Sequence, residues 1–141
     1  MGVSVIQDAA APFLESAQAA DIVIGALTFN DRATAPELVR SLVQGCERAF
    51  PNRRLLVVNC DGGSTDDTSR LLRDAVRPEV PVWTIHHPGA RTWAAPISDS
   101  GVPGREAAIQ TLVHVAATIE SAVCLVVDGN LRSDAGQWPQ W

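Results

Sequence analysis

The residues of this chain that could do chemistry gather where two predicted strands end. The apolar run from Ala122 to Val127 is followed by Asp128, and Asn130 comes two residues later. A second predicted strand, Arg54 to Cys60, is followed by Asp61 and a pair of glycines. Mg²⁺ and Mn²⁺ prefer oxygen ligands and commonly take the rest of their ligands from substrate phosphates and water. The pattern therefore indicates a site for a divalent cation and a diphosphate.

Each of these side chains also has a structural interpretation. Asp128 could cap the end of its strand, and Asp61 could be an ordinary turn aspartate, but their shared position at strand ends favours function for both. Asp66 and Asp67 are interpreted as structural, because carboxylates are favoured at a helix N-terminus without any ligand. Asn130 can ligate through its carbonyl oxygen, but it carries no charge, which weakens a metal site relative to two carboxylates.

Other polar residues are less decisive. Arg105 follows Gly104 near a predicted helix start, where backbone amides and a guanidinium would suit a diphosphate. A solvated first-turn arginine is an equally good interpretation of Arg105. His86 and His87 are adjacent, so they point to opposite faces of a strand and make a poor joint metal site. The tryptophans are expected in the core or at an interface; they are Trp83, Trp93, Trp138 and Trp141.

Alternating strand and helix signals predict an α/β fold. Two further strands are predicted from Ile22 to Thr28 and from Pro81 to His86. Continuous apolar strands are typical of a mainly parallel sheet with helices on both faces, which gives three αβα layers. Ligands of such sheets bind beyond the carboxyl ends of the strands, where the strand order reverses. This places Thr28, Phe29 and Asn30 on the same edge as the aspartates.

Three helices are expected between these strands. The first begins at Thr34-Ala35-Pro36-Glu37, which fits a capping box with proline in the first turn, and is ended by Pro51. The second has Ser64 to Asp67 at its N-terminus, and the third runs from Gly104 to Ala122. The whole chain, 1–141, is predicted to be one domain, with a helix or arm over 1–20, a core over 21–133 that carries the strand-end residues, and a tail over 134–141.

Composition excludes several classes of protein. The formal net charge of −5 argues against a nucleic-acid partner, because binding to phosphate backbones needs clustered cations. The chain has no lysine and no glycine-rich turn after its first strand, which argues against a P-loop and a dinucleotide fold. No apolar run reaches the length of about 18 residues that a membrane span needs. The three cysteines have no C-x-x-C spacing and are interpreted as buried thiols, so the cytoplasm is the expected compartment.

The order of these motifs resembles the nucleotide-binding half of family 2-like glycosyltransferases with the GT-A fold. The resemblance covers Asp21 to Ser133 and is nearest to the branch of glucosyl-3-phosphoglycerate and mannosylglycerate synthases. It rests on four segments that match the branch in order: Thr28-Phe29-Asn30 (its T-Y-N), NCDGGSTDDT from Asn59 to Thr68, GVPGR from Gly101 to Arg105 (its G-[IV]-P-G-K), and VVDGNLRS from Val126 to Ser133 (its V-D-x-D-L-R-S).

The resemblance implies roles for single residues. It implies that Thr28, Phe29 and Asn30 contact the nucleoside of a UDP- or GDP-linked sugar and that Asp61 reads the base. Gly104 and Arg105 then meet the phosphates. Asp128 serves the sugar diphosphate and, with Asn130, a divalent cation, Mg²⁺ or Mn²⁺. The implied activity is transfer of the sugar to a small hydroxyl acceptor.

Two departures from the family pattern leave alternatives open. Asn130 stands at the second acidic position of the metal motif, and the chain ends about where the acceptor half would begin. A nucleotide-binding or partner-binding module without turnover is therefore a second hypothesis. A third is another doubly wound domain, nucleotidyltransferase-like or receiver-like, with coincidental motifs. We also expect the last strand to form an exposed edge with Val123, Leu125 and Val127 poorly shielded, and hence a homo-oligomer.

Overall fold

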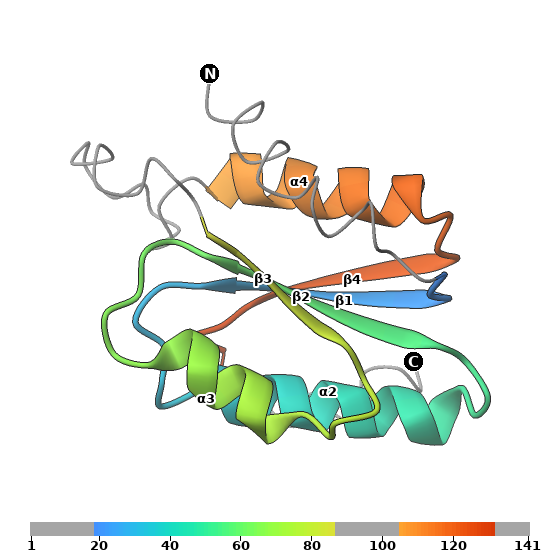
Figure 1. Cartoon of the computed structure of the whole chain (residues 1–141), viewed down its shortest axis with the longest axis horizontal. Coiled ribbons are helices and arrows are strands. Elements are labelled where there is room, and N and C mark those ends of the chain that lie inside the picture. Colours follow the sequence, from blue (N-terminus) through green and yellow to red (C-terminus); the bar gives the residue numbers. More distant parts are fainter. Residues whose placement is uncertain (1–18, 87–104, 132–141) are drawn as a thin grey trace.

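The computed structural model describes residues 19–86 and 105–131 of the chain. Within this part, four strands alternate with three helices in an α/β fold (Figure 1). The strands are β1 (Ile22–Thr28), β2 (Leu55–Asp61), β3 (Val82–His86) and β4 (Val123–Asp128). The helices are α2 (Ala35–Ala49), α3 (Thr68–Ala75) and α4 (Arg105–Thr118).

The four strands form one parallel sheet in the order β3-β2-β1-β4. The chain builds outward from β1 through β2 to β3 and then returns to place β4 on the other side of β1. The strand order therefore reverses between β1 and β4, and the crevice beyond their carboxyl ends is where ligands of such sheets bind. The prediction of a parallel sheet flanked by helices is confirmed.

Helices cover both faces of this sheet. Figure 1 shows α2 and α3 on one face and α4 on the other. Successive side chains of a strand point to opposite faces, so each strand contributes to two separate cores. The central strands β1 and β2 are buried along their whole length, which explains the apolar runs in both; their polar residues, Thr28, Asn59 and Asp61, lie at or near the carboxyl ends.

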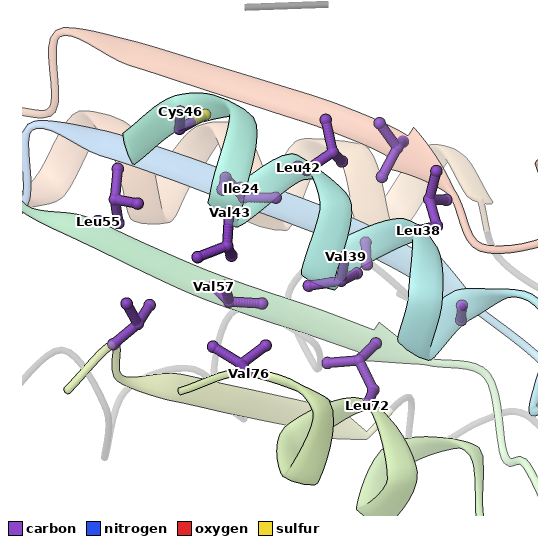
Figure 2. Close-up of a cluster of buried hydrophobic side chains, with 14 of the residues drawn as sticks. Ile24, Leu38, Val39, Leu42, Val43, Cys46, Leu55, Val57, Leu72 and Val76 are labelled. Carbon is purple, nitrogen blue, oxygen red and sulfur yellow. The ribbon is translucent and has the colours of Figure 1, made fainter. Parts of the chain in front are cut away.

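The core beneath α2 and α3 is the larger of the two (Figure 2). α2 places Val39, Leu42 and Val43 on the sheet at helical spacing, against Ile24 of β1 and Val57 of β2. Burying each such side chain stabilises the fold by about 1.5–3 kcal/mol. This packing fixes the direction in which α2 leaves the tip of β1.

The core beneath α4 depends on one close approach. Leu112 of α4 is fully buried over Gly25 of β1, and a methyl group added at Gly25 would lie 2.6 Å from Leu112 Cδ1. Glycine therefore allows α4 to lie close to the sheet. The N-terminus of α4 is thereby held near the end of β4.

The predicted capping box at Thr34 is wrong, although the helix begins where expected. Thr34 makes no side-chain capping hydrogen bond. Its hydroxyl instead donates to the carbonyl oxygen of Gly129, at 2.7 Å, and Glu37 pairs with Arg40. α3 begins at Thr68, later than Ser64, because Asp67 adopts a left-handed backbone conformation with φ of 67°.

The thiols and the edge strand bear on two further predictions. Cys46 and Cys60 are buried, Cys124 is half-buried, and all three are free; burial raises the pKa of Cys60 to about 12.

β4 forms one edge of the described sheet, but Val127 is buried beneath α2, so the expectation that Val127 is poorly shielded is wrong. Val123 is exposed, as predicted, Leu125 is half-buried, and Val126 is exposed as well. No helix in the described ranges is long and apolar enough to cross a membrane.

Candidate functional site

The loops that follow β1 and β2 are joined by polar contacts. The backbone amide of Asn30 donates to Ser64 Oγ at 2.8 Å, and the amide of Thr65 donates to Asn30 Oδ1 at 2.8 Å. The amide of the next residue, Asp31, donates to Thr68 Oγ1 at 2.9 Å. Asn30 has a positive φ of 52°, a conformation that asparagine tolerates better than most residues. These hydrogen bonds hold the loop after β1 and the loop after β2 together, and we call the two the braced loops.

Asp61 holds the second of these loops from within. Its side chain is buried, and donors lie within hydrogen-bond distance of both carboxylate oxygens. Oδ2 accepts from the amides of Gly63 and Ser64 at 3.1 and 2.9 Å. Oδ1 lies 2.6 Å from Ser64 Oγ and 3.0 Å from Thr28 Oγ1. The Thr28 hydroxyl has one proton and donates either to Asp61 or to Asn59, so Asp61 accepts three or four hydrogen bonds from its own chain, near the capacity of about four that a carboxylate has.

Thr28 and Phe29 differ in how a ligand could reach them. Thr28 is fully buried, and its hydroxyl lies 2.7 Å from Asn59 Oδ1 as well as near Asp61. Phe29 is half-buried and Asn30 is exposed. Of the three residues in this turn, Phe29 and Asn30 are therefore the ones that a nucleoside could touch directly.

Asp128 lies at the end of β4 on the opposite face of the sheet from Asp61. Asp61 is in register with Thr28 and Asp128 with Leu27, and these two neighbours point to opposite faces. Asp128 Oδ2 accepts a hydrogen bond from Arg105 Nη1 at 2.7 Å. Asp128 Oδ1 is buried and has no hydrogen-bond partner among residues 19–86 and 105–131. The structure thus pairs two predicted site residues, Arg105 and Asp128, and separates both from Asp61.

The turn after Asp128 packs directly on β1. The amide of Gly129 donates to the carbonyl oxygen of Leu27 at 2.8 Å. A methyl group at Gly129 would lie 2.9 Å from that oxygen and 3.1 Å from Asp31 Oδ2. Only a residue without a side chain fits here. Asn130 follows this turn and is exposed, while Gly104 lies outside the described residues.

Asp31 is a site residue that the sequence analysis missed. Its Oδ2 accepts from the amide of Phe29 at 2.9 Å, which closes the turn after β1. Burial raises the pKa of Asp31, and the nearby charges of Asp128, Asp66 and Asp61 raise it further, against the hydrogen bond from Phe29. The signal in the sequence was the polar pair Asn-Asp directly after a buried strand.

His86 is a second contact that the sequence interpretation set aside. It ends β3 beside Asp61 in the sheet register, with Nδ1 3.7 Å from Asp61 Oδ2. Its side chain is exposed, whereas that of Asp61 is buried. His86 therefore lies at the outer rim of the braced loops.

The residues present fit a divalent cation only if phosphates of the ligand and water supply some of the metal ligands. The buried, unpartnered Oδ1 of Asp128 is an available ligand atom. Within residues 19–86 and 105–131, no three acidic, histidine or cysteine side chains gather closely enough to hold a metal ion. A cation at Asp128 would thus need further ligands from phosphates and water, as Mg²⁺ commonly does.

A hollow of about 510 Å³ lies at the other edge of the sheet, near the amino ends of β2 and β3, and is lined by Arg53, Arg54 and Trp83 among others. None of the predicted site residues lines it. We place the candidate site at the carboxyl edge because the strand order reverses there and the Arg105–Asp128 pair lies there.

Comparison with known proteins gives one kind of match. No protein-family model matches the chain, and no curated protein matches it in sequence. Among solved structures, the chain is similar to the crystal structure of M. tuberculosis glucosyl-3-phosphoglycerate synthase, with 18% sequence identity and a TM-score of 0.42. The match covers 93% of this chain and 39% of that synthase.

Proposed function

We propose that this chain is a glycosyltransferase-like domain that binds a nucleoside-diphosphate sugar at the carboxyl edge of its sheet. The observation that carries the proposal is the Arg105–Asp128 pair at the point where the strand order reverses. Parallel sheets of this kind bind ligands at that point. A helix N-terminus with an arginine in its first turn is suited to a diphosphate.

Each part of the ligand has a set of residues that could receive it. The nucleoside would lie against Phe29 and Asn30, the accessible residues of the β1 turn. The diphosphate would lie at the N-terminus of α4 with Arg105. Asp61 would act through the loop that it holds, since its oxygen atoms are already occupied. We propose that base recognition comes from this braced loop.

The chemistry would be transfer of the sugar to a small hydroxyl acceptor. A bound Mg²⁺ or Mn²⁺, held by Asp128 and Asn130, would offset the charge of the leaving diphosphate. Arg105 would add a fixed positive charge on the same group. The sugar would belong to a UDP- or GDP-linked donor, and the acceptor would be a small hydroxyl compound, for which glycerate-type molecules are the first to test.

A second candidate is a binding module that holds the nucleotide without turnover. Two observations favour it. Asn130 carries no charge, and Arg105 already neutralises Asp128. Such a module would bind the nucleotide with little dependence on metal.

Calorimetry with UDP, GDP and their sugars, with and without Mn²⁺, tests the proposal. We expect saturable binding of one nucleotide series, tighter in Mn²⁺. No binding of any nucleotide up to about millimolar concentration would rule out both candidates. If a nucleotide binds, incubation of its sugar conjugate with glycerate-type acceptors separates the two: consumption of the donor indicates the transferase, and an unchanged donor indicates the module.

A further inference from the structure

The Arg105–Asp128 ion pair is unequal in its two partners. The side chain of Arg105 is 40% exposed, whereas that of Asp128 is 12% exposed. Asp128 Oδ2 accepts a hydrogen bond from the guanidinium at 2.7 Å, and Oδ1 is buried without a partner in the part of the chain that the structure describes. A buried carboxylate oxygen is normally hydrogen-bonded, because leaving it unpaired costs free energy. Asp128 therefore has unused capacity to bind a positively charged group.

The position of Arg105 explains why it pairs with Asp128. Arg105 is the first residue of α4, a helix of 14 residues. The N-terminus of a helix carries partial positive charge, which disfavours a cation and favours an anion. Asp128 offsets this unfavourable placement, so its carboxylate acts as an internal anion at the end of α4. A diphosphate that arrived there would compete with Asp128 for the same guanidinium.

We propose that Arg105 gates Asp128. The guanidinium occupies the carboxylate that a divalent cation needs, and a diphosphate releases that carboxylate by drawing Arg105 to itself. This inference rests on the proposed function of the site. It predicts that the cation alone binds weakly. It also predicts that bound anion raises the affinity for the cation and that bound cation raises the affinity for the anion, because both require the Arg105–Asp128 ion pair to open.

The first test measures Mn²⁺ alone, by electron paramagnetic resonance titration of the full chain without nucleotide. Arg105→Gln should tighten Mn²⁺ binding by about tenfold, since it removes the competing positive charge and frees Oδ2 of Asp128 beside the already unpartnered Oδ1. Adding Asp128→Asn to that variant should abolish the gain. The matched control is Arg54→Gln, which breaks the Arg54–Asp21 ion pair at the amino edge of the sheet and should leave Mn²⁺ affinity unchanged.

The location of bound Mn²⁺ is checked by nuclear magnetic resonance. In Arg105→Gln, Mn²⁺ should broaden the amide signals of Gly129 and Leu131, which adjoin Asp128, before those of residues near Asp21. Equal Mn²⁺ affinity in wild type and Arg105→Gln, with both variants folded by circular dichroism, would overturn the proposal. So would a gain in affinity that survives Asp128→Asn.

The second test measures the anion without the metal. In EDTA, Asp128→Asn should bind the nucleoside diphosphate more tightly than wild type, because the internal anion that competes for Arg105 is gone. Weaker or equal binding would overturn the gate. The Mn²⁺ titration needs no nucleotide, so complete failure of nucleotide binding would refute the proposed function and leave the first test to decide the gate.

Discussion

At the scale of single residues, Asp61 and Asp128 have different surroundings although both follow a buried strand. Asp61 faces the side of α2 and α3 and accepts hydrogen bonds from its own loop. Asp128 faces α4, pairs with Arg105 and keeps one oxygen unpartnered. Of these two aspartates, Asp128 is therefore the one with an oxygen atom available to a ligand. We expect substitutions of the two residues to have different consequences.

Asp61→Ala should lower stability and nucleotide affinity together, with or without metal. The substitution leaves the amides of Gly63 and Ser64 without their acceptor, and the loop that they brace carries the nucleoside contact. We expect a loss of about 1–3 kcal/mol in the free energy of unfolding, from the buried donors left unpaired. Thermal unfolding and calorimetry in EDTA measure the two effects. Asp74→Ala, which removes an exposed carboxylate of α3 outside this network, is the control. Loss of affinity at full stability would indicate a direct contact with the base.

Asn130→Asp should strengthen binding of Mn²⁺ in the presence of the nucleotide. The residue is exposed directly after the Asp128 turn, and the substitution adds a second carboxylate at the position where the family motif has one. Carboxylates are preferred ligands of such cations. Calorimetry of the nucleotide at varied Mn²⁺ concentration measures the change. An unchanged dependence on Mn²⁺ would show that this side chain faces away from the site.

Asp31→Asn should stabilise the fold at neutral pH. Burial raises the pKa of Asp31 above the ordinary value of 3.8, so the ionised carboxylate costs folding free energy. That cost is fully present above the raised pKa and disappears below 3.8, where the group is protonated in both folded and unfolded chains. The asparagine oxygen can still accept from Phe29. The gain in melting temperature should therefore shrink as the pH falls. A gain independent of pH would contradict this cause.

At the scale of elements, the sequence predicted strands better than helix ends. The predicted strand Ile22 to Thr28 matches β1 in full, because a strand buried on both faces is apolar along nearly all of its length and stands out from its polar flanks. α4 was predicted over Gly104 to Ala122 and is observed over Arg105–Thr118. The Thr34 capping box failed because the hydroxyl has a partner, Gly129, in the turn after β4, far along the chain. Local patterns cannot reveal such long-range contacts.

Gly25→Ala should destabilise the chain by pushing α4 away from the sheet. The new methyl group would lie 2.6 Å from Leu112 Cδ1, in a fully buried contact. Overpacking of this kind typically costs about 1–3 kcal/mol. Leu112→Ala alone leaves a cavity and should cost about 2–5 kcal/mol. In the double variant the methyl group gains room, so denaturant unfolding should show a loss smaller than the sum. Additive losses would mean that the two residues do not meet.

At the scale of the whole molecule, the order of the strands decides where the site lies. The alternation of apolar strands with helices predicted that the sheet is parallel, but it cannot tell on which side of β1 the last strand is placed. The structure places β4 beside β1, which brings Gly129 against Leu27 and Arg105 to Asp128. The site at this edge was therefore predictable as a set of strand ends. Its division between two faces of the sheet was not.

The exposed side of β4 leads to a prediction about assembly. β4 forms an edge of the described sheet and has no charged residue before Asp128. Val123 and Val126 are 45% and 39% exposed. Flat apolar edges without charged residues tend to pair with other strands. We therefore expect a homodimer that buries β4.

Light scattering of the purified chain at high micromolar concentration should give twice the mass of one chain. Val126→Glu should shift the protein to a monomer with little change in melting temperature, because a charge on an edge strand opposes pairing while the core stays intact. Phe50→Glu is the matched control: Phe50 is similarly exposed, at 42%, but caps the far end of α2. Since β4 ends at Asp128, the monomeric variant also tests whether the site depends on the partner. Unchanged nucleotide affinity would separate assembly from binding, and a wild-type monomer would exclude the dimer.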